Sequence, residues 1–158
     1  MSSIVDRVLI FLVIVGFGFA LYSIRNTPTG EDNKLAGEVF LAENAKKENI
    51  ITTASGLQYE ILVKGTGPSP VATSEVTVHY RGTMLNGEEF DSSYSRNMPT
   101  DFPVNHVIPG WTEGLQLMNV GAKYRFFIPA ELAYGEEGAG TGIPANSTLI
   151  FEVELLKF

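Results

Sequence analysis

The sequence predicts an α+β fold in which a curved antiparallel sheet wraps around a helix. Several segments after Gly56 alternate apolar and polar residues, a period typical of strands with one buried face. One short segment, residues 111–118, is instead apolar at helical spacing, at Trp111, Leu115 and Met118. A set of antiparallel strands with a single short helix is typical of the α+β class.

Four stretches are predicted to form strands. Residues 57–65 (LQYEILVKG) place one apolar face on Leu57, Tyr59, Ile61 and Val63, and residues 75–85 (EVTVHYRGTML) place another on Val76, Val78, Tyr80 and Met84. Asn86 and Gly87 then indicate a hairpin turn, because both residue types tolerate positive φ. Residues 122–129 (AKYRFFIP) and 147–158 (STLIFEVELLKF) are the remaining strands.

The N-terminal region, residues 1–25, predicts a membrane anchor. Residues 8–24 carry no charge and lie between Arg7 and Arg25. A helix of about 17 to 25 apolar residues can cross a bilayer. A cleaved signal peptide, with Gly18 and Ala20 near the cleavage site, and a buried core helix remain alternatives. The polar and acidic segment that follows favours an N-terminus inside the cell and a globular part outside the cytoplasm.

Residues 26–55 are expected to form a linker and a spacer helix. Pro28 and Gly30 interrupt the chain, and residues 31–49 then follow a helical pattern with acidic residues first and lysines last, which suits the helix dipole. The apolar stripe is modest. Two interpretations stay open: a solvated spacer, or a helix that docks or self-associates. Residues 56–158 form the predicted globular domain.

The composition limits the chemistry. With 44% hydrophobic and 18% charged residues the chain can bury a core. A net charge of -7 disfavours nucleic acid as a partner. The absence of cysteine excludes disulfides, thiol nucleophiles and thiolate metal sites.

The remaining candidate reactive groups form no recognisable catalytic motif. His79 is expected on the surface of a strand, and His106 to be at most a ligand contact, because no His, Asp or Glu spacing indicates a metal site. The serines of "FDSS" lack a nucleophile-elbow context. The stretch "GEEGAGTG" lacks a phosphate-loop lysine and carries two glutamates. We therefore expect neither a metal nor a cofactor.

Aromatic residues are the remaining signal. Several lie beside glycines and prolines, where side chains line an opening as readily as they fill a core: Tyr80, Phe90, Tyr94, Phe102, Trp111, Tyr134 and Phe151. Such a set can form an apolar pocket that binds apolar side chains or rings and orients them by a few hydrogen bonds.

Three long motifs resemble one known family. The stretches "VHYRGTMLNGEEFDSS", "FPVNHVIPGWTEGLQLM" and "IPAELAYGEEGAGTGIPANSTLIFEVELL" are similar to the FKBP-type peptidyl-prolyl cis-trans isomerases, over residues 56–158. The segment before them resembles the bacterial MIP-like branch. The resemblance implies a five- to six-stranded antiparallel sheet wrapped around one short helix, with a proline-binding pocket between them.

The resemblance also implies the site. Catalytic roles fall to Asp91, Tyr134 and Tyr80. Substrate-binding roles fall to Phe90, Arg96, Val107, Ile108, Trp111, Ile143 and Phe151, with Trp111 as the pocket floor and Arg96 as partner of Asp91. Two positions depart from the family: Thr100 stands where many relatives have a rim phenylalanine, and His106 where a small or acidic residue is usual.

The implied activity is isomerisation of X-Pro bonds in folding proteins. The implied partners are proline-containing segments and the macrolides tacrolimus and rapamycin. With the anchor, these place the protein in the bacterial inner membrane with its catalytic domain in the periplasm. A non-enzymatic chaperone or tethered adaptor that only holds proline segments is the alternative.

Overall fold

The computed structural model describes residues 27–158. The predicted anchor, residues 1–25, lies outside the described residues. Within residues 27–158, no helix combines the length and the apolar character that crossing a membrane requires.

One antiparallel sheet of seven strands forms the body of the molecule, in the order β1-β2-β6-β7-β3-β4, with β5 also paired to β3. The prediction of five to six strands was too low, because β1 has two residues and β4 and β5 pair with different parts of β3. The strands are β1 (Ile51–Thr52), β2 (Gln58–Val63), β3 (Glu75–Met84), β4 (Glu89–Ser92), β5 (Thr100–Pro103), β6 (Lys123–Ile128) and β7 (Leu149–Lys157).

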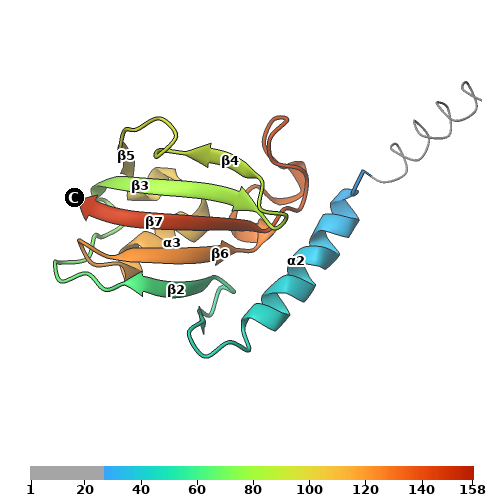
Figure 1. Cartoon of the computed structure of the whole chain (residues 1–158), viewed down its shortest axis with the longest axis horizontal. Coiled ribbons are helices and arrows are strands. Elements are labelled where there is room, and N and C mark those ends of the chain that lie inside the picture. Colours follow the sequence, from blue (N-terminus) through green and yellow to red (C-terminus); the bar gives the residue numbers. More distant parts are fainter. Residues whose placement is uncertain (1–26) are drawn as a thin grey trace, which may run out of the picture.

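Helix α3 (Pro109–Leu117) covers one face of this sheet, and Figure 1 shows it behind the strands. Pro109 occupies the first turn, where its missing N–H leaves no hydrogen bond unmade. A Cβ at Gly110 would lie 2.6 Å from Ile128, and one at Gly114 would lie 2.6 Å from Phe126. The two glycines therefore let the helix backbone approach β6 closely.

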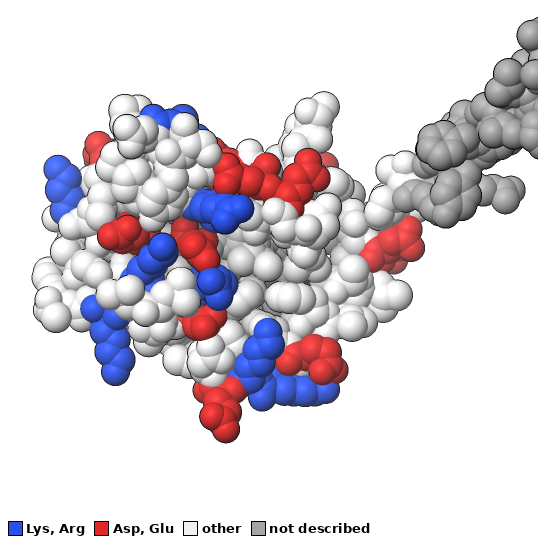
Figure 2. Space-filling view, in the orientation of Figure 1, with Lys and Arg blue, Asp and Glu red and all other residues white. Residues whose placement is uncertain are grey.

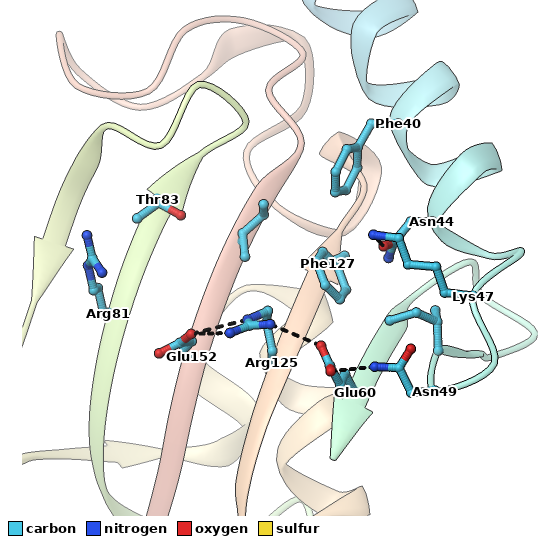
Figure 3. Close-up of a pocket in the computed structure, with 12 residues that line it drawn as sticks. Phe40, Asn44, Lys47, Asn49, Glu60, Arg81, Thr83, Arg125, Phe127 and Glu152 are labelled. Carbon is cyan, nitrogen blue, oxygen red and sulfur yellow. Dashed lines mark hydrogen bonds and ion pairs between the residues drawn. The ribbon is translucent and has the colours of Figure 1, made fainter. Parts of the chain in front are cut away.

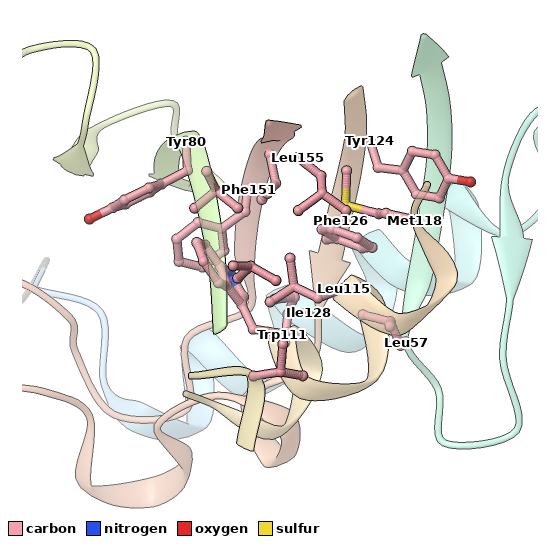
Figure 4. Close-up of a cluster of buried hydrophobic side chains, with 14 of the residues drawn as sticks. Leu57, Tyr80, Trp111, Leu115, Met118, Tyr124, Phe126, Ile128, Phe151 and Leu155 are labelled. Carbon is pink, nitrogen blue, oxygen red and sulfur yellow. The ribbon is translucent and has the colours of Figure 1, made fainter. Parts of the chain in front are cut away.

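The core lies between α3 and the inner face of the sheet (Figure 4). The expected face of β3 is confirmed, since Val76 and Val78 are fully buried and Tyr80 is 4% exposed. The expected face of β2 is wrong at its end. Ile61 and Val63 are 37% and 52% exposed, in the part of β2 beyond its pairing with β1.

The predicted hairpin joins β3 to β4. Gly87 adopts φ +86°, and its N–H donates to the Met84 carbonyl at 3.0 Å. The Asn86 side chain accepts from the Glu88 N–H at 2.9 Å, so it shapes the turn without adopting positive φ itself.

Helix α2 (Gly30–Asn44) begins with a capping box in which Thr29 and Asp32 exchange hydrogen bonds. The predicted helix over residues 31–49 was too long. Asn44 turns inward and is 1% exposed, and its Nδ2 donates to Gln58 Oε1 at 2.9 Å. The chain after it forms turns.

Contacts on one side of α2 dock it against the domain. Phe40 packs on Phe127 of β6 with ring centroids 5.8 Å apart, and Gln58 Nε2 donates to the Leu41 carbonyl at 2.9 Å. Leu35 and Val39 on the other side are 63% and 57% exposed. The helix is therefore a docked element of the fold rather than a spacer surrounded by solvent.

Candidate functional site

A pocket of about 710 Å³ opens between the start of α3 and the inner face of the sheet. Its walls come from β3, β4, β5, β7, α3, the 3-10 helix η1 (Val104–His106) and the loop between β6 and β7, which holds the 3-10 helices η2 (Ala130–Leu132) and η3 (Gly135–Glu137). The lining residues are Tyr80, Phe90, Asp91, Phe102, His106, Val107, Ile108, Trp111, Tyr134, Ala139, Gly142, Ile143 and Phe151.

Trp111 forms the base of this pocket from the first turn of α3. It is 4% exposed, and it meets Tyr80, Phe102 and Phe151 edge-on with ring centroids 5.2, 5.4 and 5.3 Å away. Figure 4 shows Trp111 beside Tyr80 and Phe151. This edge-to-face arrangement is the one that aromatic quadrupoles favour, so the indole is fixed in orientation.

Tyr80 and Asp91 form one side of the pocket and are held in a hydrogen-bonded cluster with Arg96. The Tyr80 hydroxyl donates to Asp91 Oδ2 at 2.6 Å. Arg96 donates from Nη1 to Asp91 Oδ1 at 2.5 Å and from Nη2 to the Tyr80 hydroxyl at 2.9 Å. Each member thus holds the other two, and the expected pairing of Arg96 with Asp91 is present.

These contacts shift the proton affinities of the cluster in opposite directions. Burial, and then donation to Asp91, raise the pKa of Tyr80. Burial alone would raise the pKa of Asp91, but the hydrogen bonds from Tyr80 and Arg96 and the Arg96 charge together lower it below the usual value. At neutral pH the site therefore presents a neutral phenol and an ionised carboxylate.

Three hydrogen-bond donors of the pocket have no partner among residues 27–158. The Ile108 backbone N–H, at the start of α3, donates to no other described group. The Tyr134 hydroxyl makes no hydrogen bond to a described group, and the residue is 41% exposed. Trp111 Nε1 is the only buried side-chain polar atom of these residues without a partner. Donors in this state are available to a ligand carbonyl where they face the cavity.

Most of the expected site residues come together here, with two differences. Arg96 does not line the pocket and acts on it through Asp91 and Tyr80. Phe102, which was recognised as an aromatic but not assigned to the site, lines the pocket, whereas Thr100 does not.

Sequence reasoning also missed Ser93. Its side chain is fully buried, accepts from the Tyr80 N–H at 2.7 Å and lies 2.7 Å from His79 Nδ1. It ties the loop after β4 to β3 next to the site. His79 was expected on the surface of a strand; it lies in β3 but is half-buried and stacks on Tyr94 with centroids 4.5 Å apart.

A second hollow of about 480 Å³ lies between α2 and the outer face of the sheet (Figure 3). Its charged groups already have partners. Arg125 is paired with Glu152 at 2.6 Å and with Glu60 at 3.1 Å, and Arg81 is paired with Glu89 at 2.7 Å. Figure 2 shows acidic and basic side chains intermingled over this face. The inner pocket, with its unpartnered donors, is therefore the candidate functional site.

The described residues hold no group of three or more His, Asp or Glu side chains that could bind a metal ion. The residues that line the pocket are mostly apolar or aromatic, with one carboxylate and a few hydrogen-bond donors. Such a site binds an apolar ring and orients it, and it contains no nucleophile paired with a base.

Comparison with known proteins gives the relationship. A family model described as FKBP-type peptidyl-prolyl cis-trans isomerase matches residues 67–156. The chain belongs to the FKBP family. A second model, described as a domain amino terminal to FKBP-type peptidyl-prolyl isomerase, matches residues 23–61, which include α2.

Two curated FKBP relatives come from bacteria. The chain is 58% identical over 79% of its length to the FKBP-type isomerase FkpA of Aeromonas hydrophila, covering 46% of that protein. It is 55% identical over 77% of its length to the FKBP-type 22 kDa isomerase of Escherichia coli, covering 59% of that protein. The chain thus spans about half the length of the curated relatives it matches.

Solved FKBP structures share the fold. The crystal structure of FkpA from Escherichia coli has a TM-score of 0.78 at 38% identity, over 99% of this chain and 72% of that one. A Pseudomonas syringae peptidyl-prolyl cis-trans isomerase has a TM-score of 0.77 at 39% identity, over 84% of this chain and 97% of that one.

Proposed function

We propose that the chain is a peptidyl-prolyl cis-trans isomerase that accelerates rotation about X-Pro bonds in folding proteins. One observation carries the proposal: an aromatic pocket based on Trp111, with one carboxylate and unpartnered donors at its mouth, in an FKBP domain. The pocket also suits the macrolides tacrolimus and rapamycin as inhibitors.

The reaction needs no nucleophile, because no covalent bond breaks. Rotation about the imide faces a barrier of about 18 to 20 kcal/mol, which comes from resonance in the planar amide. An enzyme lowers this barrier by binding the twisted imide more tightly than either planar form. The twisted form separates less charge between nitrogen and oxygen, so a site that excludes water favours it.

Different lining residues bind the proline ring and the substrate carbonyls. The pyrrolidine ring lies on the Trp111 face and is enclosed by Phe90, Val107 and Phe151. Substrate carbonyls accept hydrogen bonds from the Ile108 N–H and the Tyr134 hydroxyl, the two mouth donors without partners. Ile143 and Phe102 close the sides of the pocket.

The Asp91 carboxylate acts on the bound imide electrostatically. Asp91 is held ionised by Tyr80 and Arg96, so its carboxylate is fixed in place beside the imide. A fixed charge needs no reorganisation when the carbonyl carbon and nitrogen change their polarity during rotation. Arg96 and Tyr80 therefore serve by positioning Asp91.

A protease-coupled assay on an Ala-Leu-Pro-Phe peptide tests the proposal. Wild type should accelerate cis-to-trans conversion well beyond the uncatalysed exchange, which takes tens to hundreds of seconds. Trp111→Ala should lose this activity, and Leu35→Ala, an exposed substitution on α2, should retain it. An uncatalysed rate in wild type, with tacrolimus binding intact, would identify the chain as the non-enzymatic proline-binding module.

The domain boundaries and the location belong to the same proposal. Residues 1–25 anchor the protein in the bacterial inner membrane as a single span, residues 26–55 connect, and residues 56–158 catalyse in the periplasm. The uncharged run over residues 8–24 supports this. Membrane partitioning and N-terminal sequencing of the mature protein test it, and a mature N-terminus after residue 20 would favour the signal peptide.

A further inference from the structure

The loop that carries Tyr134, residues 129–148 between β6 and β7, is folded back on itself. Ala139 and Ile143 exchange backbone hydrogen bonds of 2.8 and 3.1 Å near its tip. At its base the Asn146 N–H donates to the Gly135 carbonyl at 2.8 Å. The base therefore sets the position of Gly135, the residue directly after Tyr134.

The same base is tied to the first turns of α2. Asn33 Nδ2 donates to the Ala145 carbonyl at 3.0 Å, and Asn146 Nδ2 donates to the Gly30 carbonyl at 3.2 Å. These two bonds join segments more than a hundred residues apart, and Figure 1 shows the loop rising beside the N-terminal end of α2. Gly30 permits the approach, since a Cβ there would lie 3.2 Å from Ala145 Cβ.

We propose that Asn33 and Asn146 are positioning residues that use α2 to hold the Tyr134 hydroxyl at the mouth of the pocket. The inference rests on the proposed isomerase function. Neither side chain lines the pocket, so each acts only through the backbone of the loop. The helix that precedes the catalytic domain becomes part of the active-site framework.

The loop needs this external support. Gly135, Gly138 and Gly140 all adopt positive φ, so the segment around Tyr134 has a backbone with wide conformational freedom. Tyr134 is 41% exposed, and its hydroxyl has no hydrogen-bond partner within residues 27–158. The Tyr134 carbonyl accepts from the Gly138 N–H at 3.2 Å, a bond within the loop itself, so the ties at the base of the loop are what hold this segment against α2.

Point variants of the full chain test the inference. Asn33→Ala removes one tie, and Asn146→Gly removes the other while keeping the φ of +55°. Each should lower kcat/KM for the proline peptide about threefold to tenfold, the range expected for loss of one such hydrogen bond. Asn119→Ala is the matched control. It also removes a part-buried amide bond to a backbone carbonyl, that of Gly67 at 3.0 Å, but it lies beyond the far end of α3.

A second background separates positioning from general stability. In Tyr134→Phe protein the two asparagine substitutions should cause no further loss of kcat/KM, because the hydroxyl that they position is already gone. A merely structural role would cause the same loss in both backgrounds. The backbone amide resonances of Tyr134 and Gly135 should also shift in both variants and not in Asn119→Ala.

The outcomes distinguish the two proposals. An active wild type with fully active Asn33→Ala and Asn146→Gly proteins overturns this inference alone. Equal losses in the wild-type and Tyr134→Phe backgrounds also overturn it. An inactive wild type overturns the proposed function, and the amide resonances then still report whether the ties hold the loop.

Discussion

Trp111 offers the sharpest perturbation of the pocket. The indole is 4% exposed and contacts three aromatic rings at 5.2 to 5.4 Å. Trp111→Ala removes all of these contacts and leaves a cavity, so it should lower the free energy of unfolding by about 3 to 5 kcal/mol. Far-UV circular dichroism during urea unfolding measures this, since the variant lacks the only tryptophan of the chain.

Trp111→Phe gives the informative comparison. It keeps one ring in place and removes Nε1, whose buried N–H has no partner. An unpaired buried donor costs about 1 to 3 kcal/mol, so its removal should offset part of the lost packing and keep the net destabilisation below about 2 kcal/mol. Equal destabilisation by Phe and Ala would refute this reasoning.

Ligand affinity gives an independent test of the role of Trp111. Tacrolimus affinity, measured by calorimetry, should fall more than about tenfold in Trp111→Ala and stay within about tenfold of wild type in Trp111→Phe, which retains an aromatic base. Unchanged affinity in Trp111→Ala would contradict the assignment of Trp111 to the pocket floor.

Three other predictions concern the roles of Tyr134 and Asp91, the titration of Asp91, and the contact between α2 and β2. Tyr134→Phe and Asp91→Ala should each reduce kcat/KM about tenfold or more, while circular dichroism shows that the fold is intact. Full activity of the double variant would contradict the roles proposed for the Tyr134 hydroxyl and the Asp91 carboxylate. Because the pKa of Asp91 is lowered in the folded protein, its contribution to stability is present above the unfolded value of about 3.9 and is lost as the pH falls through the folded value. The difference in unfolding free energy between wild type and Asp91→Asn should therefore shrink below about pH 4, and a difference constant from pH 3 to 7 would count against the pairing with Arg96. Asn44→Ala should destabilise by about 1 to 3 kcal/mol in urea unfolding, because it leaves the buried Gln58 Oε1 without its donor, whereas an unchanged midpoint would show that water replaces the amide.

Alternation and turn chemistry predicted much of the sheet. The inward face of β3 follows directly from Val76, Val78 and Tyr80, and the hairpin follows from Gly87. The exposure of Ile61 and Val63 could not be predicted this way. An apolar alternation shows which side chains share a face, but it does not show how far the covering helix extends over that face.

The site was predicted through motifs rather than through chemistry. An apolar pocket has no distinctive spacing of reactive groups, so the residues alone indicated only an aromatic set. Phe102 was in that set but received no role from the motifs, and only the structure shows that it lines the pocket from β5. For α2 the sequence left docking and a solvated spacer as alternatives and could not decide between them, because the bonds of Asn33 and Asn146 join distant segments.

The place of β7 in the sheet bears on how the protein acquires its structure. This strand lies between β6 and β3, and it pairs with β3 along most of its length although about seventy residues separate them. Contacts between such distant segments slow folding, because a long loop must close before they form. We therefore expect that a nascent chain halted before residue 149 remains without tertiary structure, and that the domain folds in one cooperative step only after β7 has left the ribosome.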